Sequence, residues 1–306
     1  MAFFHCYRAH RFNSAAQTTV DQANEIIREM REQGYVLTLR QLYYQFVARD
    51  LIPNENREYK RLGRLVTRAR ESGVMDWQAI EDRDRSAYGT NTEEDPTQVI
   101  DGIEHGLVFD QWARQDTYLE VWVEKSALEG VVARPCNRFH VTYMACRGYL
   151  SASAAWRSGL RFQNAIADGK RPVLIHLADH DPSGLHMTED NRDRLQMFAE
   201  DYDVEVRRLA LNMDQVELYD PPPNPAKQTD SRYRSYAEAY GQECWELDAL
   251  NPMVLDTIIE DAINEYRDAD LWNDVLDEQE EVRKPLAALS ENWSLVEEFL
   301  TKEGLV

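Results

Sequence analysis

The sequence predicts a mixed α/β fold, with a helical N-terminal module followed by a mostly parallel sheet and a C-terminal group of helices. Apolar residues within residues 19–70 recur at helical spacing, and the same spacing returns after residue 251. Within residues 117–211, short apolar runs alternate with helix-like segments, which is typical of a parallel sheet covered on both faces. The 306 residues are enough for two domains, which we place at residues 1–90 and 91–306.

The composition predicts a soluble, cytoplasmic protein. No apolar run approaches the roughly 18 residues of a membrane span, and the first residues lack the apolar core of a signal peptide. The four cysteines lie far apart, without the spacing of a metal-binding knuckle, so we expect them to be reduced and mostly buried. The sequence contains neither a Walker A motif nor a GxGxxG motif, so the chain itself is not expected to bind ATP.

The formal net charge of −21 is unevenly distributed along the chain. Residues 1–90 hold 14 basic and 12 acidic side chains, whereas residues 214–306 hold 7 basic and 23 acidic ones. Acidic surfaces with few lysines suit high salt or a GC-rich genome, and nucleic-acid binding depends on the local field rather than on the total charge. The acidity of the chain therefore does not exclude a nucleic-acid partner.

Two adjacent tyrosines lie in the predicted helix Thr38–Asp50, which begins with a Thr-x-x-Gln capping box. At about 100° per residue, Tyr43 falls on the apolar stripe of this helix and is expected in the core. Tyr44 lies at the edge of the stripe, with Arg40 one turn before it. The hydroxyl of Tyr44 can therefore be exposed beside a guanidinium, where it could act as a nucleophile.

The next predicted helix, Asn54–Arg70, has one apolar face and one strongly basic face. A charged helix face is often merely solvated, but a stripe of one sign in so acidic a protein favours a phosphate backbone as its partner. With a helix at Thr19–Gln33 and room for a short hairpin at Val74–Tyr88, the module is predicted to be a winged helix-turn-helix that binds double-stranded DNA. The candidate DNA-binding residues are Arg57, Lys60, Arg61, Arg64 and Arg68.

The central part of the chain is predicted to form the sheet. Residues 173–178 are too apolar for a strand that faces water, so this strand is expected at the centre of the sheet. Amphipathic helices follow at roughly 251–268, 271–288 and 290–302, and their outer faces carry most of the excess acid. The predicted strands are Thr117–Val123, Phe139–Ala145, Val173–Ala178 and Val204–Leu211, with helices at Ser126–Val132, Ser151–Ala167 and Met187–Asp201.

Three carboxylates follow two of these strands. Glu124 comes directly after the first strand, and Asp179 and Asp181 stand two residues apart after the strand at 173–178. Ligand sites in parallel sheets form at the carboxyl ends of strands. A helix cap needs only one carboxylate, so we expect these side chains to hold a hard divalent cation; capping of the following helix is the alternative role of either aspartate.

Glu124 and the Asp179-x-Asp181 pair, followed by a proline and a glycine, resemble the Toprim signature, which implies a Rossmann-like parallel sheet. The arrangement Arg40-x-x-Tyr43-Tyr44 on a winged-helix module just before it is similar to the A subunit of topoisomerase VI and its meiotic double-strand-break relatives. The Gly-Tyr-x-Ser sequence at 148–151 is also similar to that family. The resemblance covers roughly residues 15–215 in the family's order.

The resemblance implies a Mg²⁺-dependent, type IIB topoisomerase-like DNA transesterase. Tyr44 would be the nucleophile and would form a 5′-phosphotyrosyl link, while Arg40 would steady the phosphate. Glu124, Asp179 and Asp181 would hold Mg²⁺. In the family the enzyme is a homodimer in which each tyrosine works against the metal site of the other protomer.

Only 43 residues precede Tyr44, so the N-terminal arm with which family members contact an ATPase subunit is short. This makes an ATPase subunit doubtful and is typical of a reduced, single-subunit relative that cleaves, nicks or relaxes DNA. Two alternatives stay open. One is a Toprim nuclease in which water attacks and Tyr44 is structural, and the other is a catalytically idle DNA-binding protein.

Overall fold

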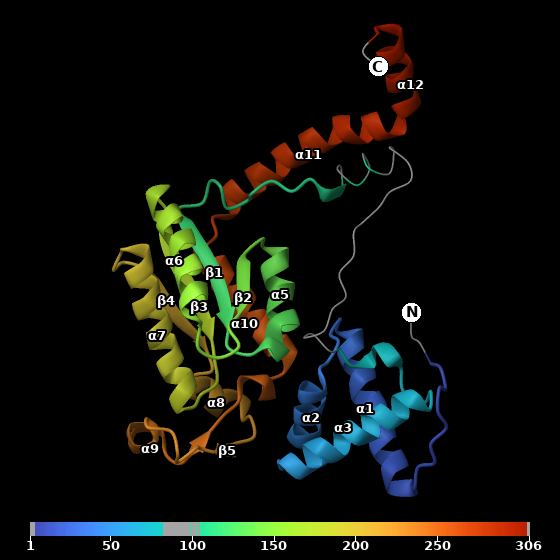
Figure 1. Cartoon of the computed structure of the whole chain (residues 1–306), viewed down its shortest axis with the longest axis vertical. Coiled ribbons are helices and arrows are strands. Elements are labelled where there is room, and N and C mark those ends of the chain that lie inside the picture. Colours follow the sequence, from blue (N-terminus) through green and yellow to red (C-terminus); the bar gives the residue numbers. More distant parts are fainter. Residues whose placement is uncertain (1–3, 82–98, 100–101, 103–104, 305–306) are drawn as a thin grey trace. The chain divides into compact units, whose positions relative to one another are not determined.

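The computed structural model describes residues 4–304 apart from residues 82–98, 100–101 and 103–104 (Figure 1). The predicted domain boundary at residue 90 lies outside the described residues. Within the described part of the chain, no helix is long and apolar enough to cross a membrane.

The chain forms two compact units, and each unit is built from two separate stretches of sequence. The first unit combines Met1–Arg85 with Leu119–Glu265, and the second combines Ser86–Tyr118 with Tyr266–Val306. The predicted tyrosine module and the predicted metal-binding sheet therefore belong to the same unit.

Local capping signals define the N-terminal helices. The side chain of Asn13 accepts a hydrogen bond from the N–H of Ala16 at 2.8 Å, so the first helix begins before its predicted start. The predicted capping box is confirmed, because Thr38 and Gln41 each accept a hydrogen bond from the backbone N–H of the other. The apolar faces of these helices share one core. The helices are α1 (Ser14–Glu32), α2 (Leu39–Ala48) and α3 (Asn56–Glu71).

The hairpin predicted at Val74–Tyr88 is not confirmed. In its described part, up to Glu81, the chain forms a 3₁₀ turn (Trp77–Ala79) and a single parallel bridge between Leu37 and Ile80. The side chain of Asp76 caps this turn by accepting a hydrogen bond from the N–H of Gln78, which favours a turn over an extended strand. The rest of the predicted hairpin lies outside the described residues.

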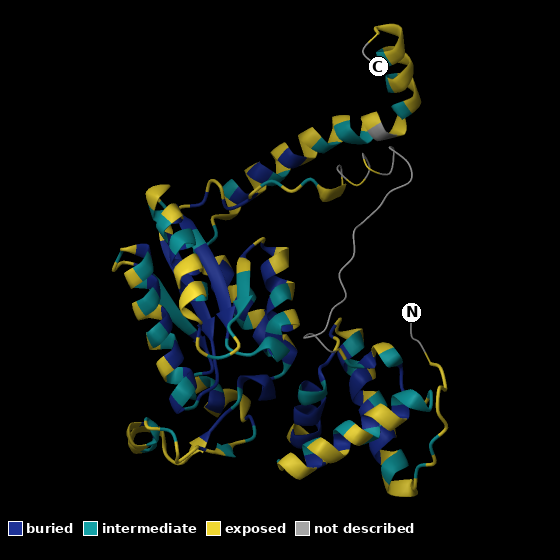
Figure 2. Ribbon diagram, viewed as in Figure 1, coloured by how far each residue is buried: buried dark blue, intermediate teal, exposed yellow. Residues whose placement is uncertain are grey.

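A four-stranded parallel sheet forms the centre of the first unit, in the order β2-β1-β3-β4. The prediction that the strand at 173–178 is central is confirmed: β3 lies between two neighbours, and its residues from Pro172 onward are buried (Figure 2). In register, Val123 pairs with Ala145 and Leu177 pairs with Ala210, so the strands end at a common edge. The strands are β1 (Thr117–Val123), β2 (Thr142–Ala145), β3 (Arg171–Leu177) and β4 (Glu205–Ala210).

Helices cover both faces of this sheet, as Figure 1 shows. On one face, α6 and α7 pack so closely that a Cβ on Gly159 would overlap Phe198. On the other side lie α5 and α10, and the buried residues of α10 include Leu255, Ile259 and Ile263. These helices are α5 (Glu129–Arg138), α6 (Ala152–Ala167), α7 (Pro182–Ala199) and α10 (Pro252–Tyr266).

Between β4 and α10 the chain forms a smaller lobe in which two short strands pair in antiparallel fashion. Its elements are α8 (Met213–Tyr219), β5 (Asn224–Pro225), α9 (Tyr233–Tyr240), β6 (Glu243–Cys244) and a 3₁₀ turn, η3 (Leu247–Ala249).

The second unit contains α11 (Ala269–Glu291) and α12 (Trp293–Lys302), which together with α10 confirm the three predicted C-terminal helices. The ring of Trp272 on α11 packs edge-on against Trp112, with the ring centres 6.0 Å apart. No residue of α12 is buried in the described structure.

The β3 strand carries an imidazole, His176, that is completely buried. Its Nδ1 lies 2.8 Å from the hydroxyl of Thr188, and its Nε2 lies 3.2 Å from the amide nitrogen of Asn191. Because an amide nitrogen can only donate, Nε2 accepts and the ring is neutral. Burial lowers the pKa of His176 to about 3, and the positive charge of Arg208 acts in the same direction.

We expect the free energy of unfolding to decrease by about 2 kcal/mol between pH 7 and pH 5 through this one group. The unfolded imidazole, with a pKa of about 6.5, binds a proton in this range, whereas folded His176 does not. Urea denaturation at the two pH values measures the loss, and His176→Gln is the control because glutamine does not titrate. An equal pH dependence in both proteins would show that His176 is not the source.

Candidate active site

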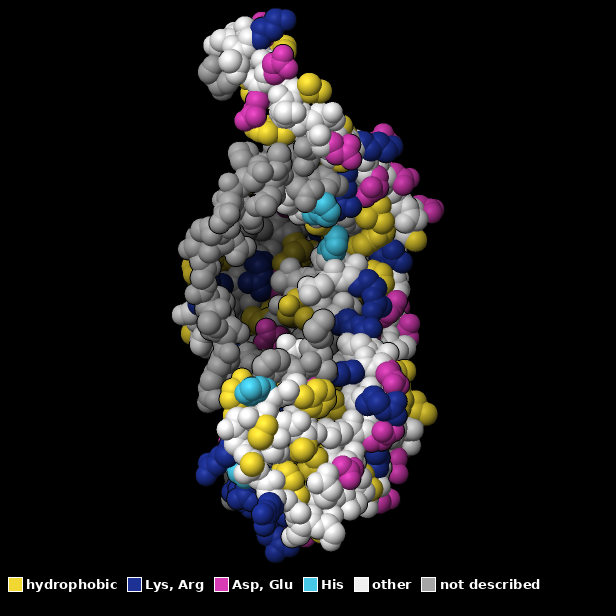
Figure 3. Space-filling view, turned by 90° about the vertical axis from the view of Figure 1, so that its right-hand side faces the viewer, with side chains coloured by type: hydrophobic (Ala, Val, Ile, Leu, Met, Phe, Trp, Pro, Cys, Tyr) yellow, Lys and Arg dark blue, Asp and Glu magenta, His cyan; other side chains and the backbone are white. Residues whose placement is uncertain are grey.

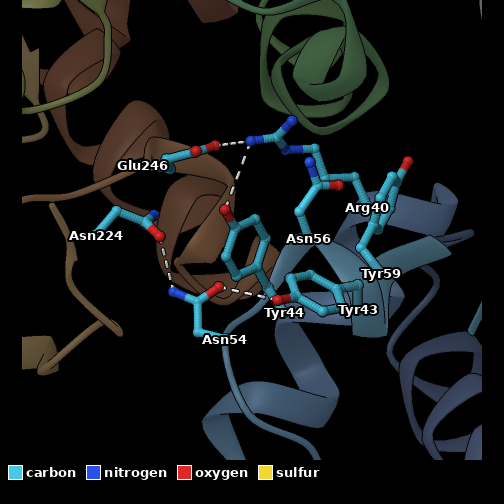
Figure 4. Close-up of a pocket in the computed structure, with 8 residues that line it drawn as sticks. All are labelled: Arg40, Tyr43, Tyr44, Asn54, Asn56, Tyr59, Asn224 and Glu246. Atoms are coloured by element: carbon cyan, nitrogen blue, oxygen red, sulfur yellow. Dashed lines mark hydrogen bonds and ion pairs between the residues drawn. The ribbon is translucent and has the colours of Figure 1, made fainter. Parts of the chain in front are cut away.

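A cavity of about 290 Å³ opens beside the two tyrosines of α2. Figure 4 shows that its walls come from α2 and α3 on one side and from the smaller lobe on the other. Phenol, guanidinium, amide and carboxylate groups therefore meet in one small space. The lining residues are Arg40, Tyr43, Tyr44, Asn54, Asn56, Tyr59, Asn224 and Glu246.

The two tyrosines differ in what their hydroxyls contact. The hydroxyl of Tyr43 donates to Oδ1 of Asn54 at 2.9 Å and lies 3.3 Å from the carbonyl oxygen of Glu55. The hydroxyl of Tyr44 has one weak contact among the described residues, with Nη2 of Arg40 at 3.5 Å. Tyr43 is thus held by its neighbours, whereas the oxygen of Tyr44 stays available inside the cavity.

Tyr44 is only 4% exposed, so the residue is buried about as fully as Tyr43, although it lines the cavity. The reason is that α2 packs against η3 of the smaller lobe, and Ala249 joins the same hydrophobic core as Tyr44. Burial raises the pKa of the Tyr44 phenol, and the carboxylates of Asp248 and Glu246 act in the same direction. Tyr43 is buried as predicted.

The three predicted carboxylates line a second cavity, of about 430 Å³. Glu124 comes from the end of β1, and Asp179 and Asp181 come from the loop between β3 and α7. Arg40, Asn224 and Glu246 line both cavities, so the two adjoin within one unit of one chain. The amide nitrogen of Asn224 is buried and has no hydrogen-bond partner among the described residues. This nitrogen is an unused donor beside both cavities.

Each carboxylate of this group makes a different contact. An oxygen of Glu124 accepts a hydrogen bond from the N–H of Asp179 at 3.0 Å. Asp181 accepts from the N–H of Gly184 at 2.6 Å, so the alternative role of capping α7 is confirmed for this aspartate. Asp179 accepts from the N–H of Leu247 at 2.8 Å, and its second oxygen lies 2.7 Å from Nζ of Lys125. Burial raises the pKa of Asp179 to about 7, although Lys125 opposes this shift.

Sequence reasoning missed a charge network that connects the two cavities. Nζ of Lys125 lies 2.8 Å from Oε2 of Glu246 and 3.1 Å from Oδ1 of Asp248. Arg40 forms ion pairs with both of these carboxylates, and its Nε lies 2.7 Å from Oδ2 of Asp248. The spacing of its carboxylates could have indicated this network, because Glu246 and Asp248 stand two residues apart, as Asp179 and Asp181 do.

Backbone contacts fix the loop that carries Asp179 and Asp181. His180 and Trp245 exchange both of their backbone hydrogen bonds, at 2.9 and 3.0 Å. The guanidinium of Arg208 donates to several backbone carbonyl oxygens around the loop, including that of Asp179 at 2.7 Å. Contacts within the chain therefore fix the backbone of this loop.

The donor set fits a magnesium ion in part. Glu124 and Asp181 each keep one carboxylate oxygen that accepts no hydrogen bond from a described residue. Mg²⁺ commonly takes one or two protein carboxylates and completes its shell with water and phosphate oxygens. Across the described residues, however, no three His, Cys, Asp or Glu side chains are grouped as metal ligands. Both oxygens of Asp179 already have partners within the chain, Lys125 and the N–H of Leu247.

The motif at 148–151 lies next to this site. Tyr149 lines the second cavity, and Gly148 has a φ of +90°, a conformation that favours glycine. Ser151 caps α6 by accepting a hydrogen bond from the N–H of Ala154 at 3.2 Å. Only the tyrosine of this motif therefore lines the cavity.

All five candidate DNA-binding residues of α3 are exposed. Arg57 and Arg61 lie beside the carboxylate of Glu58, whereas three others form no ion pair with any described residue. Figure 3 shows Lys and Arg side chains gathered low on the molecule, over the N-terminal helices. The unpaired residues are Lys60, Arg64 and Arg68.

No protein-family model matches the sequence, and comparison with curated proteins finds no significant match. The candidate site is therefore defined by the contacts within this chain.

Proposed function

We propose that the protein is a Mg²⁺-dependent DNA transesterase of the topoisomerase type, which cuts DNA through Tyr44. One arrangement supports this proposal above all: the cavity that holds Tyr44 and Arg40 adjoins the cavity lined by Glu124, Asp179 and Asp181. A phosphodiester that spans the two cavities would meet a phenol, a guanidinium and a set of metal-binding carboxylates together.

The chemistry is an exchange of one phosphate ester for another. The Tyr44 oxygen forms a bond to phosphorus, the bond from phosphorus to the 3′ oxygen breaks, and the DNA is left with a 5′-phosphotyrosyl link. The phenol proton leaves to water, and the 3′ oxygen departs as a hydroxyl after it takes up a proton. Arg40 would balance the charge on the phosphate. Glu124, Asp179 and Asp181 would hold Mg²⁺, which would stabilise the negative charge of the phosphate and of the leaving oxygen.

The proposed assembly is a homodimer on double-stranded DNA. The resemblance implies active sites shared between the protomers, but the two cavities adjoin within one chain, so a site need not be shared. In the homodimer, one copy would cut one strand and its partner the other.

Covalent capture on supercoiled plasmid tests the proposed function. The protein is incubated with plasmid in Mg²⁺ or in EDTA, and the reaction is stopped with a denaturing detergent. We expect protein attached to a 5′ DNA end only in the Mg²⁺ reaction. Cut DNA with free ends would contradict transesterification.

A hydrolytic nuclease is the second candidate, and the burial of Tyr44 favours it, since a buried phenol with a raised pKa is a weak nucleophile. In that case water would attack the phosphate. Cleavage would then leave free ends, survive the Tyr44→Phe substitution and disappear in Asp179→Asn. Salt-dependent DNA binding without any cutting would instead identify a catalytically idle DNA-binding protein.

We expect loss of the unpaired basic residues of α3 to weaken DNA binding roughly equally for all sequences. The triple variant should reduce the slope of log affinity against log salt by about 2 to 3, because each phosphate contact contributes about 0.9. Fluorescence anisotropy with a labelled duplex at several salt concentrations measures this slope. An unchanged slope would exclude α3 as the phosphate-binding face. The triple variant is Lys60→Ala, Arg64→Ala and Arg68→Ala, and the charge-matched control on exposed arginines elsewhere is Arg157→Ala, Arg192→Ala and Arg234→Ala.

A further inference from the structure

Lys125 lines the second cavity and is surrounded by three carboxylates. Its Nζ lies 2.7 Å from Asp179, 2.8 Å from Glu246 and 3.1 Å from Asp248. An ammonium group has three N–H donors, so each donor has a carboxylate partner. Burial alone would lower the pKa of Lys125, but the three carboxylates raise it, and the side chain is a cation at neutral pH.

The ammonium occupies a carboxylate oxygen that a bound metal ion would need. Glu124 and Asp181 each keep an oxygen that accepts no hydrogen bond from a described residue. Both oxygens of Asp179, in contrast, have partners, the N–H of Leu247 and the ammonium of Lys125. Of the three predicted ligands, only Asp179 is neutralised by a cation within the described structure.

The partner that Lys125 must retain is Asp248. The Asp248 side chain is completely buried, and its charge is balanced by Lys125 and Arg40. A buried carboxylate that loses its cations is strongly destabilising. When Lys125 leaves Asp179, it therefore stays with Asp248 and Glu246.

We propose that Lys125 is the resident counter-ion of Asp179, and that a divalent cation binds Asp179 by displacing this ammonium toward Glu246 and Asp248. This inference rests on the proposed metal site. Because Arg40 pairs with the same two carboxylates, the displaced charge of Lys125 weakens the hold on Arg40. Cation binding thereby makes the Arg40 guanidinium available to a phosphate, so that metal and DNA bind with positive coupling.

The affinity for Mn²⁺, measured by the loss of its free EPR signal, tests the displacement without any activity assay. We expect Lys125→Met to bind Mn²⁺ about tenfold more tightly than the wild-type protein, since the competing charge is gone. Lys227→Met is the matched control, because Lys227 lines the same cavity but is exposed and unpaired among the described residues. An exposed charge of this kind should change the affinity by no more than about two- to threefold.

The outcomes separate this inference from the proposed function. Equal affinities in the wild-type protein and in Lys125→Met, or equal effects of the two lysine variants, would overturn the displacement and leave the metal site standing. Absence of Mn²⁺ binding in all three proteins would overturn the metal site and the displacement together.

Should Lys125→Met fail to fold, the wild-type protein gives a second readout. The chain has only six lysines, so NMR spectra of protein labelled at lysine Cε contain few signals, and Lys125 is identified with Lys125→Arg. We expect Mg²⁺ to shift the Lys125 signal with the same midpoint as metal binding. A Lys125 signal that does not move at saturating Mg²⁺ would overturn the displacement.

Discussion

Tyr44→Phe is expected to abolish the covalent protein–DNA product, while Tyr43→Phe is expected to retain it. Removing the oxygen that attacks in the proposed reaction should reduce covalent capture by at least about a thousandfold. Tyr43 contributes its hydroxyl to Asn54 and Glu55 instead, so its loss leaves the nucleophile in place. Gel analysis of plasmid quenched in denaturing detergent measures both results.

The stability of the same variants provides an internal control. Among the described residues the Tyr44 hydroxyl has only the 3.5 Å contact with Arg40, so Tyr44→Phe should change the free energy of unfolding by less than about 1 kcal/mol. Tyr43→Phe loses a 2.9 Å hydrogen bond and should cost about 1 kcal/mol. Tyr44→Phe is thus expected to be the more stable of the two variants and also the inactive one. Misfolding would then be excluded as the cause of its lost activity. If both variants still attach to DNA, Tyr44 is not the nucleophile.

Gly184→Ala is expected to reduce the free energy of unfolding by about 3 kcal/mol or more. A Cβ at Gly184 would overlap the carbonyl oxygen of Asp179 and lie 3.0 Å from its carbonyl carbon. These two atoms belong to the backbone of a loop to which Arg208 donates hydrogen bonds, so the loop has little freedom to move aside. Protein that does fold should have a displaced Asp179 and weaker Mn²⁺ binding.

Urea denaturation and Mn²⁺ EPR measure the two effects. Gly106→Ala is the control, because a Cβ there would meet no atom of a described residue within 4 Å. If Gly184→Ala unfolds at the same urea concentration as the wild-type protein, α7 does not approach the backbone of Asp179 as closely as described.

Local patterns predicted much of the fold. The strand Thr117–Val123 has its predicted limits, and the capping box of Thr38 is present, because each depends on residues next to one another in sequence. The hairpin predicted at Val74–Tyr88 was inferred from the length of the segment rather than from a residue pattern. In its described part, Asp76 stabilises a 3₁₀ turn instead.

The carboxylates of the site were predictable, but their partners were not. Glu124 and Asp179 follow strands whose ends meet at one edge of the sheet, so topology brings them together. Lys125 pairs with carboxylates more than 100 residues later in the chain, and no periodicity connects such positions. The burial of Tyr44 likewise depends on η3, which a helical projection of α2 cannot include.

The reciprocal hydrogen bonds between His180 and Trp245 limit how far the first unit can be truncated without loss of the site. They join the loop after β3 to the segment that carries Glu246 and Asp248, residues that come well after the last strand of the sheet. A fragment that ends after β4 would keep all four strands but would leave Arg40 and Lys125 without two of their carboxylates. The smallest functional fragment of the first unit must therefore extend at least through η3, although the sheet alone is complete by Ala210.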